Sequence, residues 1–455
     1  MKSRRRAIKS KNKRPQNTRK RRGGEAIAHG GFGCVFYKGL KCKGGKVVDN
    51  TITKLMTIHQ ATREYNNITK FEGLLKDIPH YTHYFLLYGF SLCEPDDLSR
   101  EDMIGFDTHC TYLKRYKITS ANVNNTLSKL RVIRMPYGGL EIYDYVEHVK
   151  LQYEKMLLLN TTLLSLFTDG ILQMNNRNVY HCDIKGSNVL VDELDAGKLY
   201  TRLIDWGMSV HITSEKIPPI LQNKSIQYNM PFSAILFTND FITMYATASS
   251  LGGLFDLEPF VHRYVLYWVQ SRGVGHISTI NRIFKQIHLT EPMDKMKHFS
   301  TEVLQYKYAY YYVFKYITDV LRKYTVDGKF EMQKYFVNIF LKNVDVWGFI
   351  MIYYDVLKCY NSSTDYDKKI TNTIKLLIML VVENGAELID REKLKQLIMK
   401  LNSLISIPPT PKLSSMYGFS SMSSTPKLPS TPKLPSTPKL PSMSRLPLMS
   451  RFQIL

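Results

Sequence analysis

The sequence predicts an α+β fold in which a small strand-rich lobe is followed by a larger helical lobe. Residues 25–60 contain Gly-rich turns and short β-like runs such as CVFYKGL. Residues 150–178 carry apolar side chains at intervals of three and four, which is the spacing of a core-facing helix. After residue 235 the chain is mostly helical again, and its Tyr and Phe stripes predict core packing.

The composition is that of a globular chain with charged ends. Of 455 residues, 44% are hydrophobic and 12% aromatic, which is enough for a large core and for two or three domain-sized units. The net charge of +23 is concentrated at the termini. Residues 1–22 hold 12 Lys and Arg and no acid, and residues 403–455 hold six Lys and Arg and no acid. The middle of the chain is therefore only weakly basic.

Both terminal segments are predicted to be disordered. Residues 1–22 have little to bury, and they predict either a basic arm that contacts nucleic acid or another polyanion, a nuclear-import signal, or a solvated tail. Residues 403–455 contain STPKLP three times in succession, and a proline-rich repeat of this period predicts extended, solvated chain. Its Thr-Pro pairs could accept phosphate, but a plain spacer explains them equally well.

The six cysteines are widely spaced, with no CxxC pair and no histidine cluster at metal spacing. They predict neither a zinc site nor a dense disulfide framework, and a reducing compartment follows as the expectation. The basic N-terminus lacks the apolar segment of a secretory signal, and the apolar run Leu376–Val382 is too short to cross a bilayer. The sequence therefore predicts a soluble intracellular protein without membrane insertion.

A glycine-rich segment, IAHGGFGCVF at residues 27–36, is the first candidate binding site. Gly30 and Gly33 predict a turn whose backbone can approach phosphate oxygens without a Cβ in the way. Alone this signal is weak, because glycine-rich hairpins are common. Lys54 follows in the strand-like run TITKLM, where a half-buried lysine either meets an anion or snorkels at an edge.

The stretch VYHCDIKGSNVLVD, residues 179–192, places four polar side chains between strand-like ends. Asp183 can orient an attacking hydroxyl, Lys185 can supply a cation for a transferring phosphoryl group, and Asn188 an amide oxygen for a metal ion. Further on, LIDWG places Asp205 at the end of a strand, where a carboxylate can hold Mg²⁺ against phosphates. The order and spacing of these groups carry more weight than any one of them.

With these motifs the sequence resembles the eukaryotic-type protein kinases across roughly residues 25–400. Lys54 corresponds to the lysine of the third strand, the segment from His181 to Asn188 to the catalytic loop, and Asp205 to the aspartate of the D-F-G motif. The loop that covers ATP in the family corresponds to Ile27, Ala28, His29, Gly30, Gly31, Phe32, Gly33, Cys34 and Val35.

The resemblance implies a bilobal protein-kinase-like fold over residues 23–402, with an N-lobe at 23–139 and a C-lobe at 140–402. The segment RVIRMPYGG, residues 131–139, resembles the strand and hinge that meet adenine.

The resemblance also implies the chemistry. Asp183 would be the catalytic base with Lys185 beside it, Lys54 would hold the α- and β-phosphates of ATP, and Asn188 and Asp205 would bind Mg²⁺. Because Lys185 is the form typical of Ser/Thr kinases, the expected reaction transfers the γ-phosphoryl group to Ser or Thr hydroxyls of a protein. The segments GLKC and QYNMPFSAILF are similar to kinases of large DNA viruses of the iridovirus type, which would mean a host cell or a virion as location.

Several positions depart from the family pattern. Ala28 replaces the first glycine of the loop, Trp206 replaces the phenylalanine of D-F-G, and no A-P-E motif is visible. Cys182 replaces the arginine that normally pairs with a phosphorylated activation loop, which puts that mode of control in doubt.

The acidic partner of Lys54 and the segment 91–129 are less well defined. Glu64 and Glu72 are both candidates for the partner, and Glu64 is favoured because Ile68 and Phe71 follow it at helical spacing. Residues 91–129 look like an insertion, for which the sequence indicates no chemical role.

Two other functions stay open. A small-molecule phosphotransferase of the aminoglycoside-kinase type shares the catalytic stretch, and IDWG at 204–207 fits it, but that family usually carries histidine at the position of Lys185. A pseudokinase that acts as a scaffold would be expected to have lost the base, the lysine or the metal-binding aspartate. Lys54, Asp183 and Asp205 are all retained.

Overall fold

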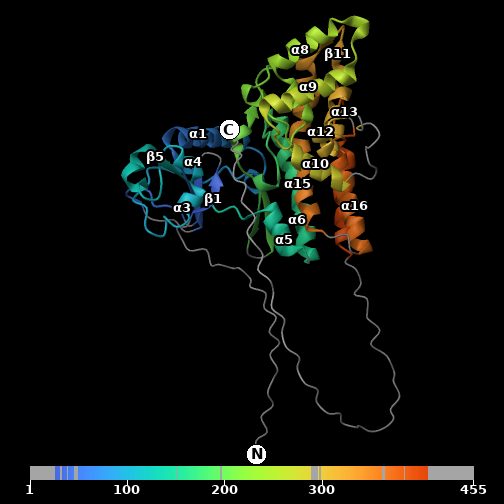
Figure 1. The fold of residues 1–455 in the computed structure, drawn as a ribbon. Helices are drawn as coiled ribbons and strands as arrows, with labels where there is room; N and C mark the ends of the chain where they lie inside the picture. Colours follow the sequence, from blue (N-terminus) through green and yellow to red (C-terminus); the bar gives the residue numbers. More distant parts are fainter. Residues whose placement is uncertain are drawn as a thin grey trace, which may run out of the picture. The chain divides into compact units, whose positions relative to one another are not determined.

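The fold combines small antiparallel sheets with a larger helical part, as a computed structural model of the protein shows (Figure 1). By its internal contacts the chain divides into two units, residues 1–409 and 410–455. The predicted α+β class is confirmed. The structure describes residues 26–30, 33–37, 39–45, 50–150, 152–194, 197–287, 296, 299–360, 364–383 and 385–407, all in the first unit.

The predicted basic arm, residues 1–22, lies outside the described residues, and so does nearly all of the predicted tail, residues 403–455. Helix α17 (Arg391–Ile405) continues a few residues past the predicted boundary at 402.

The strand-rich part is a five-stranded antiparallel sheet with the strand order β1-β2-β3-β5-β4. Short β-branched and apolar runs form these strands, as the sequence predicts for residues 25–60. Helix α1 (Ile58–Leu75) follows β3 without a loop. The strands are β1 (Ala26–Gly30), β2 (Gly33–Tyr37), β3 (Thr51–Thr57), β4 (Ser91–Cys93) and β5 (Leu130–Pro136).

The two faces of this sheet have different partners. Val35, Lys54 and Ile133 lie opposite one another on β2, β3 and β5, so their side chains share a face. This face packs against α1. Cys34 and Leu55 are also paired and point the other way, because successive side chains of a strand alternate.

The predicted insertion, residues 91–129, covers this second face. Its short helices α3 (Phe106–His109) and α4 (Thr111–Lys114) contact β1 and β2. Phe106 and Leu113 are fully buried there in one cluster with Phe36 of β2. The insertion therefore completes a second small core behind the sheet.

Two disulfides hold the insertion in place. Cys34 of β2 is bonded to Cys110 between α3 and α4, and Cys42 is bonded to Cys93 of β4. The prediction excluded a dense disulfide framework and did not include these two bonds. Packing of α3 and α4 on the sheet brings Cys110 to Cys34, 76 positions earlier, and a backbone bridge between Cys42 and Pro95 brings Cys42 to Cys93, 51 positions later. The cysteines therefore no longer support the expectation of a reducing compartment.

The helical part surrounds a second antiparallel sheet with the order β6-β8-β9. Its aromatic segments form one large buried core, as their Tyr and Phe stripes predict. Before the catalytic segment lie α5 (Ile142–Val149), α6 (Tyr153–Ser165), a π-helical turn (Leu166–Ile171) and α7 (Leu172–Asn176); the strands are β6 (Leu140–Glu141), β7 (Val179–Tyr180), β8 (Val189–Leu194), β9 (Lys198–Leu203) and β10 (Val210–His211).

Helix α15 (Leu341–Cys359) has side chains that are nearly all buried. α15 contacts α5 and α16, and α16 packs against α17 (Figure 1). The other elements are α8 (Asn239–Ser249), α9 (Leu257–Arg272), α10 (Ile277–Ile287), α12 (Thr301–Gln305), α13 (Lys307–Tyr324), β11 (Thr325–Val326), β12 (Lys329–Phe330), α14 (Met332–Tyr335) and α16 (Asp365–Met379); short α2 (Tyr81–Tyr84) lies earlier in the chain.

Two helices of the described chain are long and apolar enough to cross a membrane by length and composition alone. They are Tyr153–Asn176 and Met332–Cys359, and within the protein 44% and 83% of their most apolar windows are buried. Buried core helices meet the same criterion, so this finding is weak evidence for a membrane. The absence of membrane insertion stays a prediction.

We expect reduction of the two disulfides to destabilise the fold, because each closes a long loop in the unfolded chain. The typical effect is about 2–4 kcal/mol of unfolding free energy per bond. Thermal melts with and without dithiothreitol measure it, and mass spectrometry of a non-reduced digest identifies the pairs. Cys359→Ser, at a buried free cysteine, should leave the drop in Tm unchanged. Equal melting temperatures for fully oxidised and fully reduced protein would contradict the expectation.

Candidate functional site

The glycine-rich segment forms the hairpin of β1 and β2. Gly30 and Gly33 are paired across it, and Gly31 and Phe32, which stand between them in the sequence, lie outside the described residues. Gly33 has a reason of its own to be glycine, because a Cβ there would collide with the backbone oxygen of Leu55 on β3 and would lie 2.6 Å from Cγ of Met56. Packing against β3 is therefore enough to explain a glycine at this position, without the predicted close approach of a phosphate.

Lys54 points from β3 toward α1 and forms an ion pair there. Its Nζ donates to both carboxylate oxygens of Glu64, at 2.8 and 2.7 Å. Both side chains are largely shielded, with 14% and 24% of their surfaces exposed. Glu72, the other candidate, accepts instead from the hydroxyl of Tyr81 at 3.5 Å. The expected pairing of Lys54 with Glu64 is therefore present.

Asp183 is the centre of a hydrogen-bonded cluster. Its Oδ2 accepts from Nζ of Lys185 at 2.9 Å and from Nδ2 of Asn188 at 3.0 Å. The same Nδ2 also reaches the backbone oxygen of Asp183 at 2.8 Å, which holds the segment in a tight loop. The structure thus brings together three of the polar residues that the sequence singles out.

Asn188 and Asp205 stand at the same end of the β8–β9 hairpin. Val189 pairs with Leu203, and the backbone oxygen of Asn188 accepts from the N–H of Ile204 at 3.0 Å. Asn188 therefore directly precedes β8, and Asp205 follows β9 after one intervening residue. Strand pairing is the reason that residues far apart in the sequence come close here.

The oxygens of these two residues are suited to a hard divalent cation. The amide nitrogen of Asn188 is committed to Asp183, and its Oδ1 accepts no hydrogen bond from the described chain. The carboxylate of Asp205 is exposed and likewise has no partner in the described ranges. Mg²⁺ commonly takes one or two protein oxygens and completes its shell with water and phosphate. The donor set therefore fits Mg²⁺.

Protein side chains of the described chain do not by themselves form a complete metal site. Among the described residues, no three His, Cys, Asp or Glu side chains are grouped so that they could hold a metal. Any metal at Asn188 and Asp205 would thus depend on ligands from a bound nucleotide and from water.

Asp345, on α15, is a residue of this site that the sequence analysis missed. Its carboxylate has no exposed surface and accepts the N–H groups of His181 and Cys182 at 2.9 and 2.8 Å. Nδ2 of Asn175 donates to it at 2.8 Å. Burial raises the pKa of Asp345, and these donors act in the opposite direction. The sequence does contain a signal for this residue, because Asp345 is an aspartate inside the apolar run that forms α15.

Two residues of the site have left-handed backbone conformations. Cys182 has φ of 60° and Asp205 has φ of 62°, a region that side chains other than glycine enter at a cost of about 1–3 kcal/mol. Packing around Trp206 holds this region, since its ring lies 5.5 Å from Phe71 of α1 and 5.0 Å from the imidazole of His181. The helix that carries Glu64 is thus also in contact with the residue next to Asp205.

Asn229 is a second residue that sequence reasoning missed. It is buried, and its Nδ2 donates to Oδ1 of Asp183 at 2.8 Å and to the backbone oxygen of Ile184 at 3.3 Å. It belongs to the segment QYNMPF, in which the sequence analysis found no A-P-E motif. With Asn229 on one oxygen and Lys185 and Asn188 on the other, the carboxylate of Asp183 is held from both sides.

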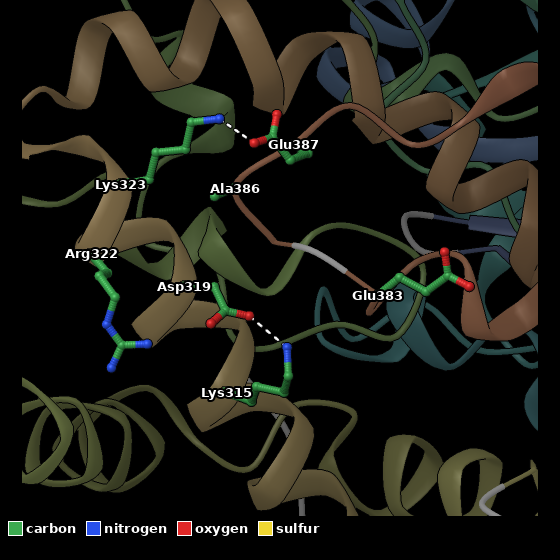
Figure 2. A pocket seen from close by; sticks show the side chains of 7 residues that line it. All are labelled: Lys315, Asp319, Arg322, Lys323, Glu383, Ala386 and Glu387. Carbon is green, nitrogen blue, oxygen red and sulfur yellow. Dashed lines mark hydrogen bonds and ion pairs between the residues drawn. The ribbon is translucent and has the colours of Figure 1, made fainter.

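A cavity of about 330 Å³ lies elsewhere, at α13, and contains none of these residues. Figure 2 shows that its charged groups pair with one another, Lys323 with Glu387 and Lys315 with Asp319 at 2.6 Å. Its lining carries three cations and three acids, so it has no excess charge to attract a phosphate. The lining residues are Lys315, Asp319, Arg322, Lys323, Glu383, Ala386 and Glu387.

Comparisons with known proteins do not place the chain in a family. No protein-family model matches it, and no curated protein sequence does. The argument for function therefore depends on the site itself.

We expect Asp345→Asn to destabilise the protein. An asparagine can accept only one of the two backbone N–H groups, and an unsatisfied buried donor costs about 1–3 kcal/mol. Urea unfolding followed by fluorescence measures the loss. Asp319→Asn is the matched control, because Asp319 pairs with Lys315 near the surface, where ion pairs contribute about 0–1 kcal/mol. Equal midpoints for Asp345→Asn and the unmodified protein would show that the buried carboxylate is dispensable.

Proposed function

We propose that this chain is an ATP-dependent serine/threonine protein kinase with a bilobal protein-kinase-like fold. The observation that carries the proposal is the cluster at Asp183, in which one carboxylate oxygen accepts from Lys185 and Asn188 and the other from Asn229. The Lys54–Glu64 ion pair and the free oxygens of Asn188 and Asp205 support it further.

In the proposed reaction Asp183 orients the acceptor hydroxyl and takes its proton. The hydroxyl oxygen forms a bond to the γ-phosphorus, and the bond from that phosphorus to the β-γ bridging oxygen breaks. Lys185 lies beside Asp183, where its charge would stabilise the oxygens of the phosphoryl group in transfer. Lys54, held by Glu64, binds the α- and β-phosphates.

Asn188 Oδ1 and the carboxylate of Asp205 would hold Mg²⁺, which neutralises the phosphates of ATP when bound. The protein's own contribution is positioning and electrostatic stabilisation, and no covalent intermediate on the chain is required. The strained backbone at Cys182 and Asp205 fits this role, because such strain is kept where geometry matters for function.

A small-molecule phosphotransferase is the second candidate, because the sequence IDWG at 204–207 fits that class. Lys185 favours a protein acceptor. Incubation with labelled ATP and Mg²⁺ separates the two. Labelled phosphoserine or phosphothreonine supports the protein kinase, whereas ATP turnover that requires a sugar or an aminoglycoside supports the alternative. Absence of nucleotide binding would contradict both and favour a scaffold.

We expect Asp183→Asn to reduce phosphoryl transfer about 10²–10⁴-fold, the usual range for loss of a general base. Nucleotide binding should persist, because Asp183 contacts the acceptor and not the purine. Transfer to casein and binding of a fluorescent ATP analogue measure the two effects. Asp97→Asn, at an exposed aspartate of the insertion, is the control and should leave both unchanged. Transfer at the normal rate by Asp183→Asn would remove Asp183 as the base.

We expect Lys54→Met to reduce phosphoryl transfer by about 10²-fold or more, because a preorganised charge on the phosphates is lost. Initial rates at several ATP concentrations measure the effect. Lys70→Met changes an exposed lysine of α1 and serves as the control. Unchanged turnover in Lys54→Met would mean that another residue holds the phosphates.

A further inference from the structure

We propose that the acceptor side of Asp183 selects hydroxyls that are flanked by an anionic side chain, a carboxylate or a phosphoryl group, and that Lys224 and His276 bind this anion. This inference rests on the proposed kinase function. It concerns a surface formed by two segments, residues 224–229 and residues 273–276, which we call the acceptor wall.

The two segments of the acceptor wall are tightly joined. The N–H of His276 donates to the backbone oxygen of Ile226 at 2.8 Å. Gly275 has φ of +49°, and a Cβ there would lie 3.0 Å from that of Ser225, so the loop between α9 and α10 approaches as only glycine allows. Nε1 of Trp268 on α9 donates to the backbone oxygen of Lys224 at 2.9 Å.

The acceptor wall is directly linked to the proposed base. Asn229, at its end, donates to Oδ1 of Asp183 at 2.8 Å. Next to it, the backbone oxygen of Tyr228 accepts from Nε1 of Trp347 on α15 at 2.8 Å. The wall is therefore fixed both to Asp183 and to the central helix, and groups on it lie close to the hydroxyl that Asp183 would orient.

Lys224 is a half-buried cation without an anionic partner in the described part of the chain. Its Nζ donates to Sδ of Met208 at 3.1 Å, and a thioether is a weak acceptor. Burial lowers the pKa of Lys224, and the charge of Asp183 acts in the opposite direction. The carboxylate oxygens of Asp183 accept hydrogen bonds from Asn229, Lys185 and Asn188, and among the described residues Asp183 forms no ion pair with Lys224.

His276 presents a second unused group on the acceptor wall, and its backbone N–H is bonded to Ile226, two residues after Lys224. Its ring lies 5.3 Å from that of Tyr228, and its buried Nδ1 has no hydrogen-bond partner among the described residues. Burial lowers the pKa of the imidazole, the charge of Lys185 lowers it further, and Asp183 raises it. The charges of both polar residues of the proposed catalytic pair therefore act on the imidazole.

The charges around the acceptor wall favour an anion. Within the described part of the chain, Asp183 is the one carboxylate whose charge acts on Lys224 and on His276, and it is held by other donors. The charges of Asp355 and Lys185 act on Glu141, and Asp355 is paired with Lys358. Neither acts on Lys224 or His276. A half-buried ammonium is costly without a counter-ion, so an incoming carboxylate or phosphoryl group would be bound strongly there.

The test compares acceptor peptides on the full-length protein with Mg²⁺ and ATP. Each peptide has one serine, and a single glutamate, phosphoserine, glutamine or lysine is moved through the positions on either side of it. We expect kcat/KM to be about tenfold higher for the best glutamate and phosphoserine peptides than for glutamine at the same position, the effect of a charge-assisted hydrogen bond. Lysine at that position should be the poorest substrate.

Variants assign the preference to the acceptor wall. Lys224→Met should bring the ratio of anionic to neutral peptide close to one, His276→Ala should reduce it, and Lys224→Arg should retain it. Lys216→Met, at an exposed lysine earlier in the same loop, should leave it unchanged. The ratio is measured within one preparation, so a partly unfolded variant still reports it.

Three outcomes decide between the proposals. A preference that is lost in Lys224→Met supports the acceptor wall. Phosphorylation without a preference for anions, or a preference that survives both Lys224→Met and His276→Ala, overturns it while the proposed kinase function stands. Phosphorylation of no peptide or protein by the unmodified chain would contradict the proposed function itself.

Discussion

A single buried carboxylate determines the shape of the catalytic segment. Asp345 lies in the first half of α15, without exposed surface, and accepts the N–H groups of His181 and Cys182. The carboxylate and the two N–H groups each depend on this contact, because an isolated carboxylate and an unpaired N–H are both costly in a core. The loop that carries Asp183 is thereby attached to α15, a helix whose side chains are nearly all buried.

The sheet and the hairpin are coupled to this centre through α1. That helix carries Glu64, which holds Lys54, and Phe71, which contacts the ring of Trp206. Trp206 in turn contacts His181, whose N–H is bound to Asp345. A shift of α1 would therefore disturb the lysine and the Asp205 region together. The larger ring of Trp206, which the sequence showed only as a departure from a pattern, extends the surface on which α1 packs.

Two segments without a role in the sequence motifs turn out to complete the structure. Residues 91–129 cover the outer face of the sheet and are bonded to β2 through Cys34 and Cys110. The loop at Gly275 and His276 packs against Ser225 and Ile226 and so supports the segment that leads to Asn229. Cys182 is buried and carries no charge to attract a phosphate, whereas Lys224 supplies a cation near it.

The sequence by itself determined the α+β class, the polar residues of the catalytic segment and the choice of Glu64, because strand alternation, helical spacing and turn chemistry are local properties. Only the tertiary structure decided that Cys34 meets Cys110, that Gly33 accommodates β3, and that Asp345 holds a loop 163 residues before it. Such contacts carry no periodic signal. They follow from how the buried faces of distant elements fit together, and that depends on the whole chain at once.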